Sequence, residues 1–269
     1  MDDDQHRNGS VAVVVGGGSG IGAAVAARQR AGGHTVVVWD VAGPRDVDCD
    51  ITGADGVDGA LSATEDRHGV PDLLTVSAGI GHAGLLTDVD PADWDRVMGV
   101  NAKGVWLVMR AVARRWRATG TAGSVVVTSS ISARVADRNM GLYCASKAAL
   151  DMVVRVAAAE WGPDGIRVNA VAPGVTRTPM LGPVPTDSGW LAGVRDRTPL
   201  DRLGQPEDIA EAAVALHGLA WVTGEILDCD GGLGLASPID SYGALLAARV
   251  ARGHSPGGGS GRVQHNGGT

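Results

Sequence analysis

Cysteine is scarce in this chain, and its spacing argues against architectures held by disulfides or metals. Cys49, Cys144 and Cys229 are an odd number at wide, irregular spacing. Such spacing indicates reduced thiols in or near the core rather than a disulfide framework or a zinc site. None of the seven histidines stands four residues from another histidine beside an acidic residue. The sequence therefore predicts no catalytic metal.

Long apolar runs and an excess of positive charge are missing as well. No uninterrupted apolar run approaches the roughly 20 residues that cross a bilayer, so no membrane span is predicted. The acidic start, Met1–Asp4, lacks the basic segment of a secretory signal, which indicates a cytoplasmic protein. With 23 basic and 30 acidic residues the net charge is −7, so the chain has no general attraction to nucleic acid or anionic lipid.

The chain does contain a regular alternation of short apolar runs and helical stretches. Its 269 residues, 44% of them hydrophobic, are enough for one α/β domain with a sizeable core. Valine-rich runs without polar alternation are typical of parallel strands buried on both faces. The pattern predicts a single-domain, doubly wound parallel sheet of the Rossmann type in three α/β/α layers. The expected strands are Val11–Val15, Thr35–Trp39, Leu73–Ser77, Ser124–Thr128, Arg167–Ala172 and Glu225–Asp228, and the expected helices are about Gly20–Ala31, Ala92–Ala118, Leu142–Trp161 and Pro206–Leu216.

Three regions depart from this alternation. Residues 1–9 are predicted to form a flexible tail before a catalytic domain that spans 10–235. Between Asp40 and Asp50 the chain is too short for a crossover helix, which predicts a short, irregular connection. Residues 236–269 form an extension with room for one more helix at Ile239–Arg252, and disorder is expected from His254 because glycine dominates there.

A glycine-rich turn follows the first expected strand. Val11–Val15 runs directly into Gly16–Gly22, which reads G-G-G-S-G-I-G, and a helix is expected to begin there. Glycines let the backbone approach a pyrophosphate, while free N–H groups and the helix dipole attract the anion. The spacing G-x-x-x-G-x-G therefore predicts a dinucleotide site. The alternative is a glycine-rich turn that binds no ligand.

Asp40 ends the second expected strand, about 20 residues beyond the glycine turn. In dinucleotide-binding folds an acid at this place accepts hydrogen bonds from the adenosine ribose and repels a 2′-phosphate, which favours NAD over NADP. The alternative for Asp40 is a solvated aspartate at a strand end. Arg45 is near enough in sequence to pair with a 2′-phosphate and so to weaken the preference for NAD.

Tyr143 and Lys147 stand four residues apart in an expected helix, so both side chains lie on one face. A phenol has an ordinary pKa of about 10, and a neighbouring ammonium favours its ionised form. The pair therefore predicts a tyrosine that takes a proton from an alcohol, or returns it, while hydride is transferred. Ser130 follows a strand and is expected at the sheet edge, where its hydroxyl can bind the substrate oxygen.

A lone Y-x-x-x-K pair also arises by chance. A chance match is less expected here because tyrosine and lysine are rare in this chain. The only others are Tyr242 and Lys103. Ser130 is less specific, because serines are common at strand ends.

Taken together, these segments resemble the short-chain dehydrogenase/reductase family from about Val11 to Gly232. The usual T-G-x-x-x-G-I-G is matched by Val15–Gly22, and the catalytic serine, thirteen residues before the tyrosine, falls on Ser130. Further motifs appear in family order, with N-N-A-G at Val76–Gly79, the catalytic asparagine at Asn101, the proline-glycine segment at Pro173–Thr176, R-x-G-x-P-E-D-I-A at Arg202–Ala210 and D-G-G at Asp230–Gly232.

The resemblance implies a role for each matched residue. Asn101 would join Ser130, Tyr143 and Lys147 as a catalytic residue and hold a water that relays protons to Lys147. Lys147 would also bind the nicotinamide ribose. The implied cofactor-binding residues are Gly16, Gly18, Ser19, Gly20, Ile21, Gly22, Asp40, Asp50, Ile51, Ala78, Gly79, Tyr143, Lys147, Pro173, Gly174, Val175, Thr176 and Thr178.

Among the departures from the family pattern, two replace polar side chains. Val15 replaces the threonine that opens the glycine motif, so a hydroxyl contact is lost. Val76 and Ser77 replace the two asparagines of N-N-A-G, which removes amide hydrogen bonds expected to stabilise the central sheet. Both affect the adenosine end and stability rather than the reacting groups.

The resemblance also bears on substrate and assembly. In the family, a segment equivalent to 180–199 forms a mobile lid, and here it carries Leu181 and Trp190, which favours an apolar or alicyclic alcohol or ketone. His82 is either a pocket residue or an ordinary loop residue. Homo-oligomers, dimers or tetramers, are implied through the helices near 92–118 and 142–161. Three functions stay open: an NAD-dependent alcohol dehydrogenase, an NADPH-dependent carbonyl reductase, and a non-catalytic dinucleotide-binding protein.

Overall fold

The computed structural model describes residues 9–182 and 189–235 of the chain. The predictions for the N-terminal tail, for lid residues 183–188 and for the extension 236–269, with its helix at Ile239–Arg252, lie outside the described residues. The chain divides into two units after Gly234, and the fold described here belongs to the first. No helix within the two described ranges is long and apolar enough to cross a membrane.

Parallel strands form the central sheet in the order β3-β2-β1-β4-β5-β6-β7. The register pairs Val15 with Trp39 and with Val76, so neighbouring strands end at the same edge. Ligands bind at this carboxyl edge in open α/β sheets. The strands are β1 (Val11–Val15), β2 (Thr35–Asp40), β3 (Val47–Asp48), β4 (Leu73–Val76), β5 (Ser124–Thr128), β6 (Arg167–Pro173) and β7 (Ile226–Cys229).

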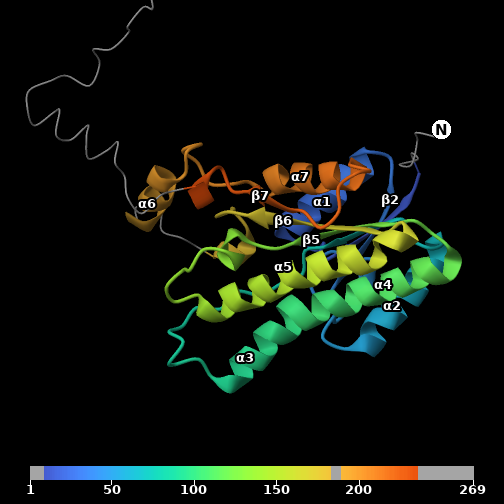
Figure 1. Cartoon of the computed structure of the whole chain (residues 1–269), viewed down its shortest axis with the longest axis horizontal. Helices are drawn as coiled ribbons and strands as arrows, with labels where there is room; N and C mark the ends of the chain where they lie inside the picture. Colours follow the sequence, from blue (N-terminus) through green and yellow to red (C-terminus); the bar gives the residue numbers. More distant parts are fainter. Residues whose placement is uncertain (1–8, 183–188, 236–269) are drawn as a thin grey trace, which may run out of the picture. The chain divides into compact units, whose positions relative to one another are not determined.

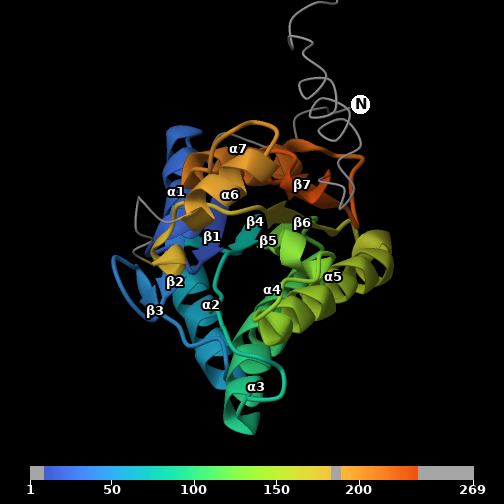
Figure 2. The same cartoon turned by 90° about the vertical axis from the view of Figure 1, so that its left-hand side faces the viewer.

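Helices cover both faces of the sheet and give the three expected layers (Figure 1, Figure 2). On one face lie α1 (Gly20–Ala31) and α7 (Pro206–Gly218). On the other lie α2 (Ala54–His68), α4 (Val105–Thr119) and α5 (Gly141–Trp161). Two shorter helices, α3 (Pro91–Met98) and α6 (Gly189–Arg197), extend beyond the sheet's carboxyl edge.

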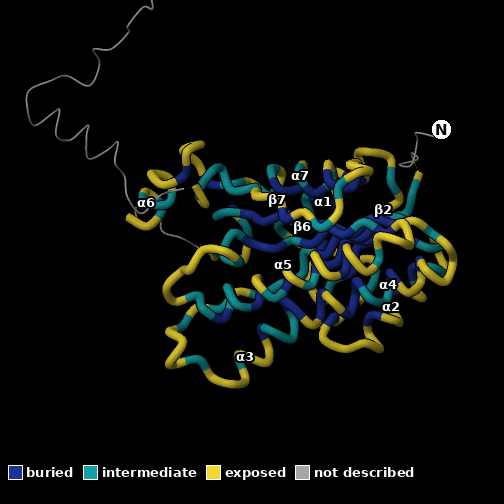
Figure 3. Tube along the Cα trace, viewed as in Figure 1, coloured by how far each residue is buried: buried dark blue, intermediate teal, exposed yellow. Residues whose placement is uncertain are grey.

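Alternate strand residues fill two separate cores. Val13 and Val15 belong to the core shared with α2, α4 and α5, whereas Val14 belongs to the core shared with α1 and α7. Figure 3 shows buried positions along the strands and on the helix faces turned toward them. Because both faces of the central strands are covered, an unbroken run of valines is stable there, and each fully buried side chain contributes about 1.5–3 kcal/mol.

Helix α2 and strand β3 are not predicted by the sequence pattern. Helix α2 contains Gly56 and Gly59, which weaken helix propensity. Its buried residues nevertheless follow helical spacing: Val57, Ala60, Leu61 and Thr64. The connection after Asp40 has no helix, as expected, but it is not wholly irregular, because β3 pairs in parallel with the end of β2.

The long helix predicted for 92–118 is not regular. A π-helical segment, η1 (Gly99–Gly104), separates α3 from α4. Each π turn holds an extra residue, so the side chains before and after η1 face different directions. Such segments often occur at functional sites, and Asn101 lies within this one.

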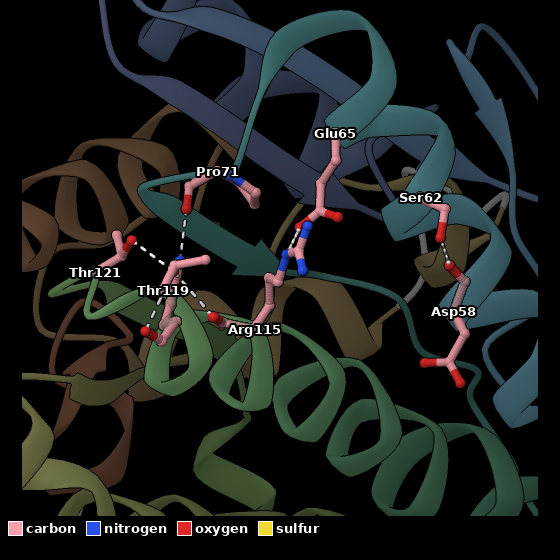
Figure 4. A network of polar contacts seen from close by, with 8 residues as sticks. Asp58, Ser62, Glu65, Pro71, Arg115, Thr119 and Thr121 are labelled. Carbon is pink, nitrogen blue, oxygen red and sulfur yellow. Dashed lines mark hydrogen bonds and ion pairs between the residues drawn. The ribbon is translucent and has the colours of Figure 1, made fainter.

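Polar contacts anchor α2 to α4 despite the two glycines of α2 (Figure 4). Arg115 of α4 donates to Glu65 of α2 at 2.6 Å, and Figure 4 shows the two side chains pointing toward one another. The Trp116 indole donates to the carbonyl oxygen of Pro71, just beyond α2. The Thr119 hydroxyl donates to the Arg115 carbonyl oxygen at 3.0 Å and closes the last turn of α4.

Hydroxyl contacts take the place of the missing asparagines in the central sheet. The Ser77 and Thr128 hydroxyls lie 2.8 Å apart and join the ends of β4 and β5. Deeper in the sheet, the His217 ring of α7 lies 3.0 Å from both the Thr75 and the Ser124 hydroxyl. The buried polar groups at this position are therefore satisfied, as a stable core requires.

Candidate functional site

A cavity of about 1270 Å³ opens at the carboxyl edge of the sheet. It exceeds the roughly 300–1,000 Å³ of a pocket for one drug-sized ligand. The glycine turn, the ends of β2, β4, β5 and β6, the start of α5 and parts of α6 all line it. Its size fits a dinucleotide together with a small second molecule.

The glycine turn packs too tightly for side chains, most of all at Gly16, Gly18 and Gly22. A Cβ on Gly22 would lie 2.1 Å from the Gly16 carbonyl oxygen, and one on Gly16 would lie 2.4 Å from the Ala78 nitrogen. A Cβ on Gly18 would meet the Ala42 carbonyl oxygen at 2.5 Å. Glycine at these positions lets the turn fold back against β4 and the chain after β2.

The first turn of α1 offers a place for an anion. Its N-cap, Ser19, makes no side-chain capping bond, and the first turn contains no acidic residue. Gly20, Ile21 and Gly22 of this turn line the cavity. Uncapped N–H groups and the helix dipole attract a phosphate at such a position. These residues therefore fit the pyrophosphate of a dinucleotide.

Asp40 lies on the cavity wall with its carboxylate oriented by backbone groups. It accepts hydrogen bonds from the nitrogens of Gly18 at 2.8 Å, Val41 at 2.7 Å and Ala42 at 3.1 Å. Two carboxylate oxygens have about four acceptor positions, so capacity for a ribose hydroxyl is left.

Arg45, which the sequence offered as a partner for a 2′-phosphate, is engaged elsewhere. It donates to the Asp48 carboxylate and, at 2.9 Å, to the Gly43 carbonyl oxygen. Asp50, which follows β3 and also lines the cavity, accepts from the Thr52 nitrogen at 2.9 Å and the Thr52 hydroxyl at 2.8 Å. These two bonds lower the pKa of Asp50.

Helix α5 and the end of β5 bring the predicted reaction centre together. Tyr143 and Lys147 both line the cavity, with the Lys147 ammonium 5.7 Å from the centre of the Tyr143 ring. The ammonium donates to the Thr128 carbonyl oxygen at 2.9 Å. Ser130 lines the same wall, and its hydroxyl accepts from the Ser132 nitrogen at 3.1 Å. Lys147 is 4% exposed and Ser130 is 7% exposed, so both groups are withdrawn from bulk water.

Burial shifts both titrating groups of this centre. It raises the pKa of Tyr143, while the Ser130 hydroxyl acts in the opposite direction. It lowers the pKa of Lys147 to about 8, and the negative charge of Asp151 opposes that change. The direction for Tyr143 differs from the expectation that the neighbouring ammonium lowers its pKa, because desolvation of the phenolate is the largest effect.

Asn101 is buried beside the cavity and does not line it. Its side chain accepts from the Ile80 nitrogen at 2.8 Å and donates to the Ile80 oxygen at 2.9 Å and the Ser146 hydroxyl at 3.0 Å. Both amide N–H groups are thus used in fixing the chain after β4 against α5. The proton relay through a water on Asn101 stays a prediction.

The chain after β6 closes the cavity over the glycine turn. Pro173, Gly174, Val175, Thr176 and Thr178 all line it. A Cβ on Gly174 would lie 2.8 Å from the Asp230 Cβ, which explains why glycine stands opposite the D-G-G segment.

The sequence predicted most of the residues that line the cavity, but not those from α6 and the loop after β5, which we call its outer end. Every predicted site residue lines the cavity except Gly18, which contacts Asp40, and Asn101. His82 lines it as well, which supports the pocket interpretation over that of an ordinary loop residue. No motif marked the remaining side chains at this end, since they come from loops and from α6: Val135, Ala136, Asp137, Met140, Val194 and Arg197.

Comparison with known proteins agrees with this geometry. A family model described as Enoyl-(Acyl carrier protein) reductase matches residues 15–234. The chain is 37% identical to cis-4-hydroxycyclohexanecarboxylate dehydrogenase of Sinomonas cyclohexanicum over 240 residues, covering 82% of this chain and 95% of the relative. It is 33% identical to D-threitol dehydrogenase of Mycolicibacterium smegmatis, covering 86% of this chain and 95% of that protein.

A solved structure shares both the fold and a substantial part of the sequence. The 3-ketoacyl-(acyl-carrier-protein) reductase of Brucella melitensis, complexed with NADH, matches with a TM-score of 0.76 and 33% identity. The match covers 84% of this chain and 99% of that one. The chain belongs to the short-chain dehydrogenase/reductase family and is an oxidoreductase that uses a nicotinamide dinucleotide.

Proposed function

We propose that this protein is an NAD-dependent dehydrogenase of secondary alcohols. The observation that carries the proposal is the meeting of Ser130, Tyr143 and Lys147 with the glycine turn on one cavity. A bound nicotinamide dinucleotide would supply the hydride acceptor. The protein would supply the proton transfer and hold the alcohol.

Tyr143 is the proposed acid/base. Its phenol takes the alcohol proton during oxidation and returns it during reduction. The Ser130 hydroxyl binds the reacting oxygen, and the Lys147 ammonium stabilises the phenolate and retains two N–H groups beyond its bond to Thr128. Asn101 supports this centre by holding Ser146 of α5 and the chain at Ile80.

The preference for NAD rests on the adenosine end of the cavity. The Asp40 carboxylate lies where a 2′-phosphate would meet like charge, and Arg45 is engaged by Asp48. The similar Brucella melitensis reductase was solved with NADH, which is consistent with this preference.

Asp40→Asn is expected to narrow the preference for NAD over NADP, measured as the ratio of kcat/KM values, by about tenfold or more. The reason is that like charges facing each other cost several kcal/mol, and the substitution removes one of them. Asp137→Asn is the matched control, because it removes a carboxylate at the outer end of the same cavity and should leave the ratio unchanged. A wild-type preference for NADP would contradict the proposal and favour the alternative, an NADPH-linked carbonyl reductase.

The outer end of the cavity supports an alicyclic substrate. Val135, Met140, Leu181, Trp190 and Val194 give it an apolar lining. The similar Sinomonas cyclohexanicum protein is named for a cyclohexane ring that bears a hydroxyl and a carboxylate. We propose a ring of this kind, with Arg197 receiving a carboxylate.

Arg197→Gln is expected to raise KM for cis-4-hydroxycyclohexanecarboxylate by about 10–100-fold, as loss of a charged hydrogen bond does, and to leave KM for cyclohexanol nearly unchanged. Arg195→Gln is the control on the same helix, because Arg195 pairs with Asp201 at 3.2 Å and does not line the cavity. Initial rates with both alcohols check the prediction. Equal changes for the two alcohols would exclude carboxylate recognition by Arg197.

We further propose that the protein is a homo-oligomer that associates through α4 and α5. Trp106 of α4 is 40% exposed, and Met152 and Val156 of α5 are 56% and 46% exposed. Large apolar side chains on adjacent helices favour contact with a second copy of the chain.

A further inference from the structure

Asp151 lies one helical turn beyond Lys147 on α5, on the face turned toward β5 and the loop after it. It is only 4% exposed and does not line the cavity. A carboxylate this deeply buried is costly unless it is paired and hydrogen-bonded. No motif drew attention to it, although its spacing continues the series Tyr143, Lys147.

The partners of Asp151 come from the loop that carries Ser130. The Ser129 hydroxyl donates to one carboxylate oxygen, and Arg134 approaches the other at 3.4 Å. The Ser129 nitrogen donates to the Val171 oxygen at 2.7 Å, and Arg134 also pairs with Asp228 of β7. Asp151 thus ties both ends of the segment around Ser130 to α5.

The same carboxylate acts on Lys147. The ammonium contacts the Tyr143 ring and donates to the Thr128 carbonyl oxygen, and Asp151 stands one helical turn further along α5. The neutral Asn101 side chain and the ammonium both flank Gly79. Burial raises the pKa of Asp151, and the Ser129 hydroxyl and the positive charges of Arg134, Arg155 and Lys147 act in the opposite direction. Asp151 is therefore the negative charge that counters the burial of Lys147, and it raises the pKa of that ammonium.

We propose that Asp151 is a positioning residue of the reaction centre, which holds the Ser130 loop in place and sets a negative charge one helical turn from Lys147. The functional consequence rests on the proposed function, because it concerns the pair that would transfer the proton. The electrostatic effect on Lys147 does not depend on turnover. The two can therefore be tested separately.

The first test measures the titration of Lys147 directly. Lysines acetylate as free amines, and Lys147 and Lys103 are the only two in the chain, so acetic anhydride at a series of pH values, read by mass spectrometry, reports both. Asp151→Asn keeps the size and an acceptor for Ser129 and removes the charge. It should lower the midpoint for Lys147 from about 8 by about one pH unit and leave exposed Lys103 unchanged.

Ser129→Ala is the matched control, because it removes the hydrogen bond and leaves the Asp151 charge in place. Its Lys147 midpoint should stay at the wild-type value. An unshifted midpoint in Asp151→Asn would overturn the proposal, whatever the enzyme's activity. So would equal shifts in both variants, because these would indicate a loosened structure rather than a lost charge.

The second test uses the reaction. Reduction of 4-oxocyclohexanecarboxylate with NADH needs Tyr143 and Lys147 both protonated, so its rate falls as pH rises through the first proton loss from the pair. Removing a nearby negative charge makes either proton easier to lose. The alkaline limb of Asp151→Asn should therefore move to lower pH by about one unit, and the limb of Ser129→Ala should not move. Active wild-type enzyme with coincident limbs would contradict the proposal and leave the proposed function intact.

Discussion

Tyr143→Phe should lower kcat for alcohol oxidation by about 10³-fold, within the range that general acid–base groups contribute. The variant keeps the ring that contacts Lys147 and lacks only the hydroxyl that exchanges the proton. Its NADH affinity, measured by fluorescence titration, should stay within about threefold of wild type, because the glycine turn and Asp40 are untouched. Absorbance of NADH during turnover gives the rate.

The chain provides its own control for this substitution. Tyr242→Phe makes the same chemical change at the one other tyrosine and should leave kcat unchanged. A Tyr143→Phe enzyme with most of its rate would exclude Tyr143 as the acid/base. A wild-type protein that binds NADH and oxidises no alcohol on a broad panel would support the remaining alternative, a non-catalytic dinucleotide-binding protein.

Gly22→Ala should disrupt the dinucleotide site and destabilise the fold. The new methyl would lie 2.1 Å from the Gly16 carbonyl oxygen, and backbone at that distance has to move apart. We expect a loss of about 1–3 kcal/mol in the free energy of unfolding, as for other overpacked sites, and no measurable NADH binding. Thermal unfolding and fluorescence titration measure the two effects.

Gly59→Ala is the matched control for adding a methyl to a helical glycine. Nothing lies within 4 Å of the position its Cβ would take in α2. That variant should bind NADH normally and gain about 0.5–1 kcal/mol of stability, because alanine loses less entropy than glycine in a helix. Normal NADH binding by Gly22→Ala would show that the turn does not hold the pyrophosphate.

The sequence predicted the strands well where a run of apolar residues alone indicates burial on both sheet faces. Strands such as Val11–Val15 consist of residues that suit burial on both sheet faces, so they were found within a residue of their true ends. Helix α2 was not predicted, because Gly56 and Gly59 lower its helix propensity. Its buried face is stabilised by tertiary contacts with α4, which the local sequence does not show. Strand β3 has only two residues and forms by pairing with β2, which no local pattern encodes.

The site was predictable where spacing alone brings residues together. Tyr143 and Lys147 share a helix face, and Gly16 and Gly22 share a turn. Asp151, by contrast, acquires its partners from the loop after β5, which is distant in sequence. The sequence also could not predict that the pKa of Tyr143 is raised, because this depends on how far the fold shields the phenol from water.

The π-helical segment η1 lets α3 and α4, which follow each other without a break, turn their side chains in different directions. A regular helix would carry the apolar stripe of α4 straight on into α3. One extra residue in the turn rotates everything before it by about 100° relative to that stripe. Asp93 of α3 thereby lies 3.7 Å from His82, which lines the cavity, while α4 keeps its fit to the sheet. Removing a single residue from Gly99–Gly104 would restore a regular helix and turn α3, with Asp93, by about 100° relative to α4.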